Sequence, residues 1–516
     1  MGYKHIKPQI QELAKKFKGN FTERAQKIAE ELGIPYTDTL RRRVSEWAPD
    51  GGKTKSDESK PSEQFLEAKK HRVDTKKRYH IFTAAQNATP VHTAFWENLK
   101  AYAEHLGADL HVIAYRYKNP TSMFVDKDHD WWDASVVKYL DAARHSIHKH
   151  MMVLSDVKTQ PTAMNPLSGM RGISGTESCI IGHPKLCLES VPVLEGYPHK
   201  LLLTTGACTI PNYTDSAAGK KGEFHHQMGA VVVELVDKDS FHVRQVTADD
   251  TGCFHDLWFK IDGGKVHIHS SCKAVVLGDL HFGEHDNRAL DASYELLNVM
   301  QPNNVVLHDV FSGYSISHHE RNNPFIQAKR ERDKSVSLRH EMQQMVDYVG
   351  TFLPYNPIIP AANHNWFIDR WLQDIDWRKY PNRHEYIEYA SVLLKGDAPK
   401  GIVAYELEKT YGDKVNCLGY NDSFRSGSWE LGQHGDVGAN GSRGSINQYK
   451  QYNTKLIVGH SHTPSRQLNV MSVGTLTKLR LGYTRGASSW MHSNVILHDN
   501  DKAQHVHIIN GKYTTL

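Results

Sequence analysis

Side chains of the kinds that bind metal ions follow five short apolar runs in the second half of the 516-residue chain. Each run is typical of a β-strand, and the polar cluster stands at its carboxyl end. Mixed carboxylate, imidazole and amide ligands suit Mn, Fe or Zn better than Ca or a thiolate site. The clusters are Asp279 and His281 in KAVVLGDLHFG, His308 and Asp309 in NNVVLHDVFSG, Asn363, His364 and Asn365 in PIIPAANHN, His434 in SWELGQHGD, and His460 and His462 in KLIVGHSHTP.

The spacing within the clusters allows two side chains to bind one ion. Residues i and i+2 of an extended segment point to the same side, so Asp279 and His281 can bind one ion together. His460 and His462 offer two imidazoles at one loop, and Asp309 can bridge two cations with its two oxygens. Two metal ions roughly 3.5–4 Å apart can polarise a phosphoryl group and supply a hydroxide nucleophile. The pattern is therefore compatible with chemistry on a phosphoryl group.

The elements that carry these clusters predict an α/β fold. In open α/β sheets, ligand sites form at the carboxyl ends of strands, so clusters far apart in the sequence can converge. The chain has 33 histidines, and a single histidine is more commonly a polar core or surface residue than a ligand. The prediction depends on the ordered set of five clusters.

These motifs resemble the calcineurin-like metallophosphoesterase superfamily, whose order is D-x-H, GD-x-x-D, GNH-[DE], H and GH-x-H. The resemblance covers roughly residues 271–500 and implies a sandwich of mixed sheets flanked by helices. It also implies two divalent metal ions, with Mn expected first and Fe or Zn as alternatives, and attack on phosphorus by a bridging hydroxide. By this resemblance, metal A takes Asp279, His281 and His462, metal B takes Asn363, His434 and His460, Asp309 bridges both, and His364 is the catalytic histidine.

The chain departs from the superfamily pattern at three positions. His308 replaces the glycine before the bridging aspartate, and Ser312 replaces the second aspartate of that motif. Asn365 replaces the acid that normally orients the catalytic histidine. We expect His308 and Asn365 to contact a ligand residue or the phosphate. Arg443, in the run GANGSRGS, either helps to cradle a phosphate or belongs to a flexible loop.

The N-terminal segment has the pattern of a helix-turn-helix. Apolar residues at helical spacing in 22–32 are followed by Gly33, and Thr37 or Asp38 can cap a second helix. That helix carries Arg41, Arg42 and Arg43, which we expect to contact DNA. The alternative is a helical hairpin with a solvated basic face. Residues 1–80 hold 19 Lys and Arg against 12 Asp and Glu, whereas the rest of the chain holds 43 against 46, which favours an attached binding module.

The chain is predicted to divide into four parts: a helix-turn-helix-like module at 1–50, a charged linker at 51–78, an α/β or β-rich domain of unknown role at 79–270, and the metallophosphoesterase domain at 271–516. No apolar run is long enough to span a membrane. The six cysteines form no CxxC pair, which argues against a disulfide framework and favours a reducing cytoplasm. Self-association into a homo-oligomer is plausible for a chain with so large a middle domain.

The substrate expected is DNA. Basic and aromatic residues in 318–340 and 366–386 could follow a phosphate backbone and stack on bases, or they could form a charged helical cap. The competing functions are a phosphodiesterase for small nucleotides, a phosphoprotein phosphatase, and a DNA-binding scaffold with a structural metallophosphoesterase domain. The whole arrangement also resembles the pre-early DNA-transfer proteins of tailed phages of the T-five type, which implies a nuclease of the host cytoplasm that acts in phage DNA transfer or host DNA degradation.

Overall fold

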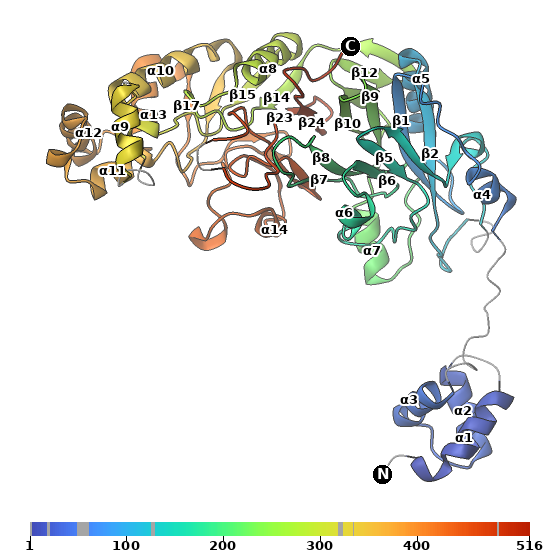
Figure 1. Ribbon diagram of the computed structural model, residues 1–516. Helices are drawn as coiled ribbons and strands as arrows, with labels where there is room; N and C mark the ends of the chain where they lie inside the picture. The colour runs from blue at the N-terminus through green and yellow to red at the C-terminus, as the bar shows by residue number, and fades with distance from the viewer. Residues whose placement is uncertain are drawn as a thin grey trace. The chain divides into compact units, whose positions relative to one another are not determined.

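A computed structural model describes residues 3–17, 21–48, 61–124, 130–317, 323–333, 335–481 and 484–516 (Figure 1). The chain divides into two compact units, Met1–Leu66 and Glu67–Leu516. Of the predicted linker at 51–78, residues 51–60 lie outside the described residues, and α4 (Glu63–Ala68) lies within the remainder. No described helix has the length and apolar character needed to cross a membrane. All six cysteines are described; they are buried and free.

Ahead of α4, the first unit contains the described α-helices α1 (Lys7–Lys16), α2 (Phe21–Glu31) and α3 (Asp38–Trp47). Gly33 follows α2 with a φ of 62°, a left-handed conformation that glycine adopts at low cost. Thr37 caps α3, because its side chain accepts a hydrogen bond from Leu40 N at 3.1 Å. The pattern at 22–47 therefore predicted α2, the turn and α3, whereas α1 was not expected. The buried residues of this unit are Ile10, Ala14, Arg24, Ala25, Ile28, Ala29, Leu40 and Val44.

The second unit is a mixed α/β structure, as predicted. Among the described residues its strands form two central sheets, one sheet shared between them and a small antiparallel sheet. Sheet 1 has the order β10 (Phe241–Thr247), β9 (Gly229–Leu235), β1 (Tyr79–Gln86), β2 (Asp109–Tyr115), β3 (Leu140–Asp141). Sheet 2 has the order β17 (Asn416–Cys417), β16 (Pro357–Ile359), β15 (Pro302–Val306), β14 (Cys272–Val276), β23 (Ser493–Leu497), β24 (Ala503–His507).

The shared sheet lies against both sheet 1 and sheet 2. Its order is β18 (Arg425–Ser426), β19 (Trp429–Glu430), β20 (Lys455–Val458), β22 (Val470–Ser472), β21 (Ser465–Gln467), β7 (Cys187–Val191), β8 (Lys200–Thr204), β6 (Ser178–Ile181), β5 (Met151–Leu154), β4 (Arg144–His148). The small sheet is β11 (Phe254–Asp256), β12 (Phe259–Asp262) and β13 (Lys265–Ile268).

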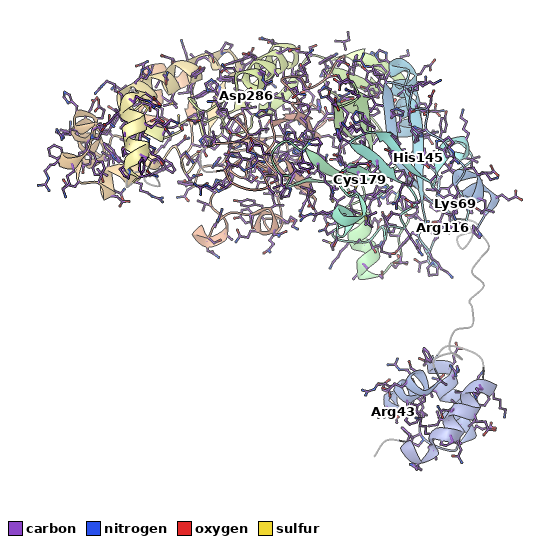
Figure 2. All side chains as sticks on the ribbon, in the orientation of Figure 1. Arg43, Lys69, Arg116, His145, Cys179 and Asp286 are labelled. Carbon is purple, nitrogen blue, oxygen red and sulfur yellow. The ribbon has the colours of Figure 1, made fainter. Side chains whose placement is uncertain are left out.

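Helices cover the outer faces of this arrangement. In Figure 1, α9 to α13 gather at one end of the unit. Asp286, labelled in Figure 2, caps α8 by accepting a hydrogen bond from Arg288 N at 2.9 Å. The described helices of this unit after α4 are α5 (Thr93–Leu106), α6 (Met170–Ile173), α7 (Ala217–Phe224), α8 (Asn287–Met300), α9 (Pro324–Arg332), α10 (Leu338–Gly350), α11 (Phe367–Asp374), α12 (Arg383–Lys395), α13 (Ile402–Tyr411) and α14 (Ile446–Tyr449).

Sheet 2 is buried on both faces, which explains its continuous apolar strands. Ala274 and Val276 of β14 pack with Ile457 and Met471 of the shared sheet, whereas Val275 between them packs with the apolar faces of α8, α10, α11 and α13. Successive side chains of a strand point to opposite faces, so one strand contributes to both cores. Sheet 1 packs on the other half of the shared sheet through a separate core.

The same strand topology occurs twice in this unit. The pairs β4–β5, β5–β6, β6–β8 and β7–β8 are antiparallel, parallel, parallel and antiparallel, and the pairs β18–β19, β19–β20, β20–β22 and β21–β22 repeat this order. β7 and β21 pair antiparallel and join the two halves. In sheets 1 and 2, β1–α5–β2 corresponds to β14–α8–β15, and β9–β10 corresponds to β23–β24. The boundary predicted at residue 270 falls between the two repeats, which share one sheet.

Candidate metal centre

The clusters predicted from the sequence meet at the carboxyl edge of sheet 2. Asp279 follows β14, Asp309 follows β15 and Asn363 follows β16. These three strands are parallel neighbours in that sheet. His434 follows β19 and His460 follows β20, which are parallel neighbours in the shared sheet. The two sheets thus place their strand ends together, and the loops beyond them carry the polar residues.

One group of donors forms around Asp279, His281 and His462. His462 Nε2 lies 3.0 Å from Asp279 Oδ2 and 3.2 Å from His281 Nε2. One ligand atom from each of the three residues lies within 4.8 Å of the others. All three side chains are buried. These are the three residues expected to hold metal A.

A second group forms around Asp309, His434 and His460, whose ligand atoms also lie within 4.8 Å of one another. His434 Nε2 lies 3.0 Å from Asp309 Oδ2, and His460 Nδ1 lies 3.0 Å from Asn363 Oδ1. Asp309 Oδ2 is also 3.7 Å from His281 Nε2. Asp309 therefore lies between the two groups, which is the position a bridging carboxylate needs.

His364 lies beside both groups, and a backbone carbonyl orients its ring. Its Nδ1 donates a hydrogen bond to Ser312 O at 2.8 Å, so Nε2 is the atom left to face the cluster. Its ring centroid is 4.3 Å from that of His281. Burial lowers the pKa of His364, although Asp309 acts in the opposite direction. Ser312, at the position of the missing second aspartate, thus provides the contact that orients the ring.

Asn365 and His308 have structural contacts in this centre. Asn365 Oδ1 accepts a hydrogen bond from Phe311 N at 3.2 Å and so ties the loop after β16 to the loop after β15. His308 is fully buried, and its Nδ1 lies 3.4 Å from His434 Nδ1. His308 and Asp279 together leave no space for a side chain at Gly459, where a Cβ would lie 2.9 Å from His308 Cγ and 2.3 Å from Asp279 Oδ1.

The backbone of the centre is held in an unfavourable conformation. His281, Asp309, His460 and His462 have φ angles of 41°, 45°, 65° and 55°. Such left-handed conformations cost non-glycine residues about 1–3 kcal/mol each and cluster at functional sites. The surrounding packing therefore maintains four strained residues, all of them predicted ligands.

The donor set fits a pair of divalent cations. Within the described residues, His434 Nε2, His462 Nδ1, His308 Nε2 and Asp279 Oδ2 are buried atoms without a hydrogen-bond partner. Unsatisfied buried polar atoms are rare and costly in native proteins. Two of them, His434 Nε2 and Asp279 Oδ2, point into the cluster at contact distance from another predicted ligand. Cations bound there would satisfy them.

The charges in the cluster favour cations as well. Burial opposes the ionisation of Asp279, but His434 and His462 bring its pKa below the ordinary value. Burial opposes the ionisation of Asp309 too, yet His434 and His364 hold its pKa well below the ordinary value. Burial would lower the pKa of His434, but Asp309 and Asp279 raise it to about 9. Two buried carboxylates thus attract positive charge to this point.

Protein A1 of Escherichia phage T5 is 30% identical to this chain over 458 residues, which cover 84% of this chain and 82% of Protein A1. The chain belongs to the Protein A1 family. No family model and no solved structure matches it.

The remaining predicted site residues are arginines, one in the loop after His434 and three in the first unit. Arg443 is exposed in the loop after His434, and within the described residues no contact brings its guanidinium to the cluster. In the first unit, Arg41, Arg42 and Arg43 lie on α3 and Arg43 is labelled in Figure 2. Each pairs with an acid of its own helix, Asp38 or Glu46. Of the segments 318–340 and 366–386, residues 318–322 and 334 lie outside the described residues.

One aromatic residue that contacts the centre, Trp490, was not predicted from the sequence. The Trp490 ring lies with its centroid 4.2 Å from that of His462 and packs edge-on against it. The residue precedes β23, and nothing in its spacing relative to the histidine motifs indicates this position. The contact between the Ser312 carbonyl and His364 was not predicted for a different reason. Every residue has a backbone carbonyl, so the residue type does not indicate such a contact.

Proposed function

We propose that the chain is a metal-dependent phosphodiesterase of the calcineurin-like metallophosphoesterase type, and that DNA is its substrate. The observation that carries the proposal is the convergence of seven predicted ligand residues and His364 at the carboxyl ends of strands of sheet 2 and of the shared sheet. The packing of sheet 2 between helices and the shared sheet is consistent with the sandwich of that superfamily. The two groups of donors share Asp309, and each contains a carboxylate and imidazoles, a set suited to Mn, Fe or Zn.

In this proposal, Asp279, His281 and His462 hold one cation, Asn363, His434 and His460 hold the other, and Asp309 contacts both. Two divalent cations bound in this way would polarise a phosphodiester and lower the pKa of a water molecule. His364, which Ser312 O fixes in orientation, presents Nε2 to the substrate, where it can stabilise the phosphoryl oxygens or hold the proton of the leaving oxygen. The Trp490 ring packs edge-on against the His462 ring.

The basic N-terminal unit supports DNA as the substrate. Arg41 and Arg42 have side chains that are 50% and 74% exposed on α3, the second helix of the helix-turn-helix pattern. The intrahelical pairs with Asp38 and Glu46 are exposed and weak, so phosphates can replace the acids. The relative in phage T5 supports the cytoplasm of an infected host as the setting of this activity.

The test is cleavage of linear and circular DNA and of bis-p-nitrophenyl phosphate, with and without Mn²⁺, by the full chain and by Asp309→Ala. We expect all three substrates to be cleaved only with Mn²⁺ and with Asp309 intact. Asp369→Asn, a change at a buried carboxylate of α11 outside the cluster, is the matched control and retains activity. Hydrolysis of the small diester with DNA intact would indicate a small-nucleotide or phosphoprotein substrate. If Asp309→Ala still cleaved both DNA and the small diester, the proposed metal centre would be refuted.

A further inference from the structure

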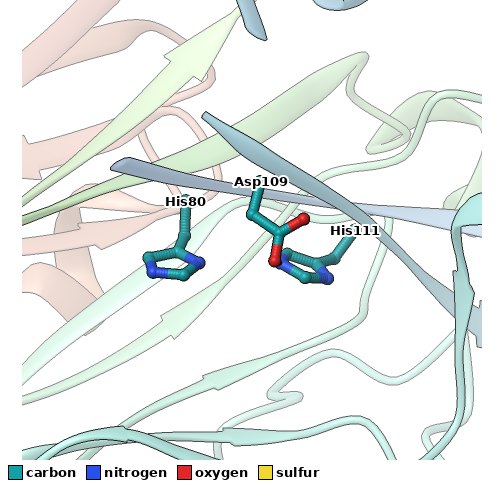
Figure 3. Close-up of side chains that lie close together, drawn as sticks. All are labelled: His80, Asp109 and His111. Carbon is teal, nitrogen blue, oxygen red and sulfur yellow. The ribbon is translucent and has the colours of Figure 1, made fainter. Parts of the chain in front are cut away.

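A second group of metal-type ligands lies in the other repeat, far along the chain from the first. His80 is on β1, and Asp109 and His111 are on the neighbouring parallel strand β2 (Figure 3). The register pairs His80 directly with Asp109, and His111 follows two residues later on the same face. One ligand atom from each residue lies within 4.8 Å of the others. None of these residues belongs to the centre described above.

Both histidines present an unused nitrogen. His80 Nε2 lies 3.1 Å from Lys77 O, so this nitrogen is the donor and Nδ1 carries the lone pair. His80 Nδ1 and His111 Nε2 are buried without a hydrogen-bond partner in the described part of the chain. Both side chains are fully buried. Histidines that bind metal commonly donate their other N–H to a carbonyl or similar acceptor, which is the arrangement of His80.

The neighbours of His111 complete the same pattern. His111 Nδ1 lies 2.8 Å from His71 Nε2, so a proton on Nδ1 leaves Nε2 free as a ligand. His111 Nε2 is 3.2 Å from Asp109 Oδ2, although this contact lacks hydrogen-bond geometry. Two ligands of a tetrahedral zinc ion, each about 2.0–2.1 Å from it, lie about 3.3 Å apart. The pair is therefore already spaced as two ligands of one ion.

The surroundings of His80 and Asp109 favour the forms of these two side chains that bind a metal ion. Burial lowers the pKa of His80 to about 4, so its ring is neutral. Burial opposes the ionisation of Asp109, but His111 outweighs it, and the pKa of Asp109 falls to about 2. Asp109 Oδ2 also accepts a hydrogen bond from Asp74 N at 3.0 Å, which fixes the carboxylate. The Asp109 side chain is 28% exposed, and this gives an ion a path from solvent.

We propose that His80, Asp109 and His111 bind one Zn²⁺-class transition-metal ion, with His71 holding the His111 ring. Two imidazoles and one carboxylate suit Zn²⁺ and related ions rather than Mg²⁺ or Ca²⁺. The ion links β1 to β2 near the N-terminal ends of these strands. Through the contact of His71 with His111, it also holds the segment after α4 against sheet 1. This site is structural and is independent of the function proposed for the first centre.

The experiment uses the full chain carrying Asp309→Ala, so that binding at the first centre is weakened. The metal-free protein is titrated with Co²⁺, whose visible spectrum reports coordination, and then with Zn²⁺ against a chromophoric chelator. We expect one ion per chain with the spectrum of a four-coordinate site, and a higher melting temperature in its presence. Asp109→Asn, at a partly exposed residue, is expected to lower the affinity at least about 100-fold, and His71→Ala about 10–100-fold.

His226→Gln is the matched control, because His226 is buried in the same repeat with both nitrogens hydrogen-bonded, to Tyr213 and Thr209. It lowers stability without changing affinity for the ion. The absence of a bound Co²⁺ or Zn²⁺ ion in the Asp309→Ala chain would overturn the proposal. An affinity unchanged by Asp109→Asn and by His80→Asn would overturn it equally, because the ion would then be bound elsewhere.

Discussion

Gly459→Ala adds one methyl group to the centre, and the structure predicts a large loss of activity from it. The new Cβ would lie 2.3 Å from Asp279 Oδ1 and 2.9 Å from His308 Cγ. Carbon contacts are most favourable at about 3.5–4.0 Å, so the Asp279 carboxylate must move by about 1 Å. That movement also breaks the 3.1 Å hydrogen bond from His460 N to Asp279 Oδ1. One methyl group thus displaces two predicted ligands.

A displacement of about 1 Å in a catalytic group can cost about 100-fold in rate, and overpacking a core costs about 1–3 kcal/mol. We therefore expect Gly459→Ala to lower kcat/KM for bis-p-nitrophenyl phosphate about 100-fold or more. Urea unfolding should show a fall of about 1–3 kcal/mol in the free energy of unfolding. The protein should remain folded, because this loss is smaller than the stability of a typical domain.

Gly182→Ala is the matched control in the other repeat. Gly182 also precedes a histidine at the end of a parallel strand, and a Cβ there would lie 2.5 Å from Ile113 Cγ2. The change should cost a similar free energy of unfolding yet leave kcat/KM within about threefold, since it touches only apolar side chains. The reasoning fails if Gly459→Ala retains activity, or if Gly182→Ala loses as much.

Three further predictions concern His364, Asp369 and the first unit. His364→Ala should retain bound Mn²⁺, measured by metal analysis, and lose most turnover; loss of the metal as well would make His364 a ligand. Burial raises the pKa of Asp369 from 3.8 to about 6, so the folded state binds its proton more tightly, and the free energy of unfolding falls as pH rises from about 4 to 6. Asp369→Asn should remove this slope and stabilise the protein at pH 7 by up to about 3 kcal/mol in thermal melts, and a slope that persists would disprove the assignment. Deleting residues 1–48 should weaken DNA binding and flatten its salt dependence while hydrolysis of the small diester survives; unchanged DNA affinity would exclude the helix-turn-helix as the binding module.

The convergence of the main cluster could be predicted because each motif follows an apolar strand, although the strands belong to two packed sheets and not to the one sheet expected. The residue types alone could not reveal how His364 is oriented, since the partner is the backbone of Ser312. The helix-turn-helix pattern accounts for two helices only, so it did not indicate the first helix, α1. Its buried residues Ile10 and Ala14 are spaced as a helix requires.

The repeat was not predicted from the sequence, because the N-terminal copy keeps the strand order but lacks most of the ligand residues of the C-terminal copy. KLIVGHSH at the end of β20 corresponds to SCIIGHPK at the end of β6, so the Gly-His pair remains and His462 corresponds to Lys185. His80, Asp109 and His111 were missed because their convergence depends on the register of β1 with β2. That register depends on how the two strands pair in the sheet, and it cannot be predicted from either segment alone.

The most direct test of the dinuclear centre is electron paramagnetic resonance of Mn²⁺ added to the metal-free full chain and to Asp309→Asn. Two Mn²⁺ ions that share a carboxylate at roughly 3.5–4 Å are magnetically coupled. The wild-type chain should therefore give the multiline spectrum of a coupled pair, and Asp309→Asn should lose it. A spectrum of isolated ions in the wild type, or a coupled spectrum that survives in Asp309→Asn, would contradict the centre described here.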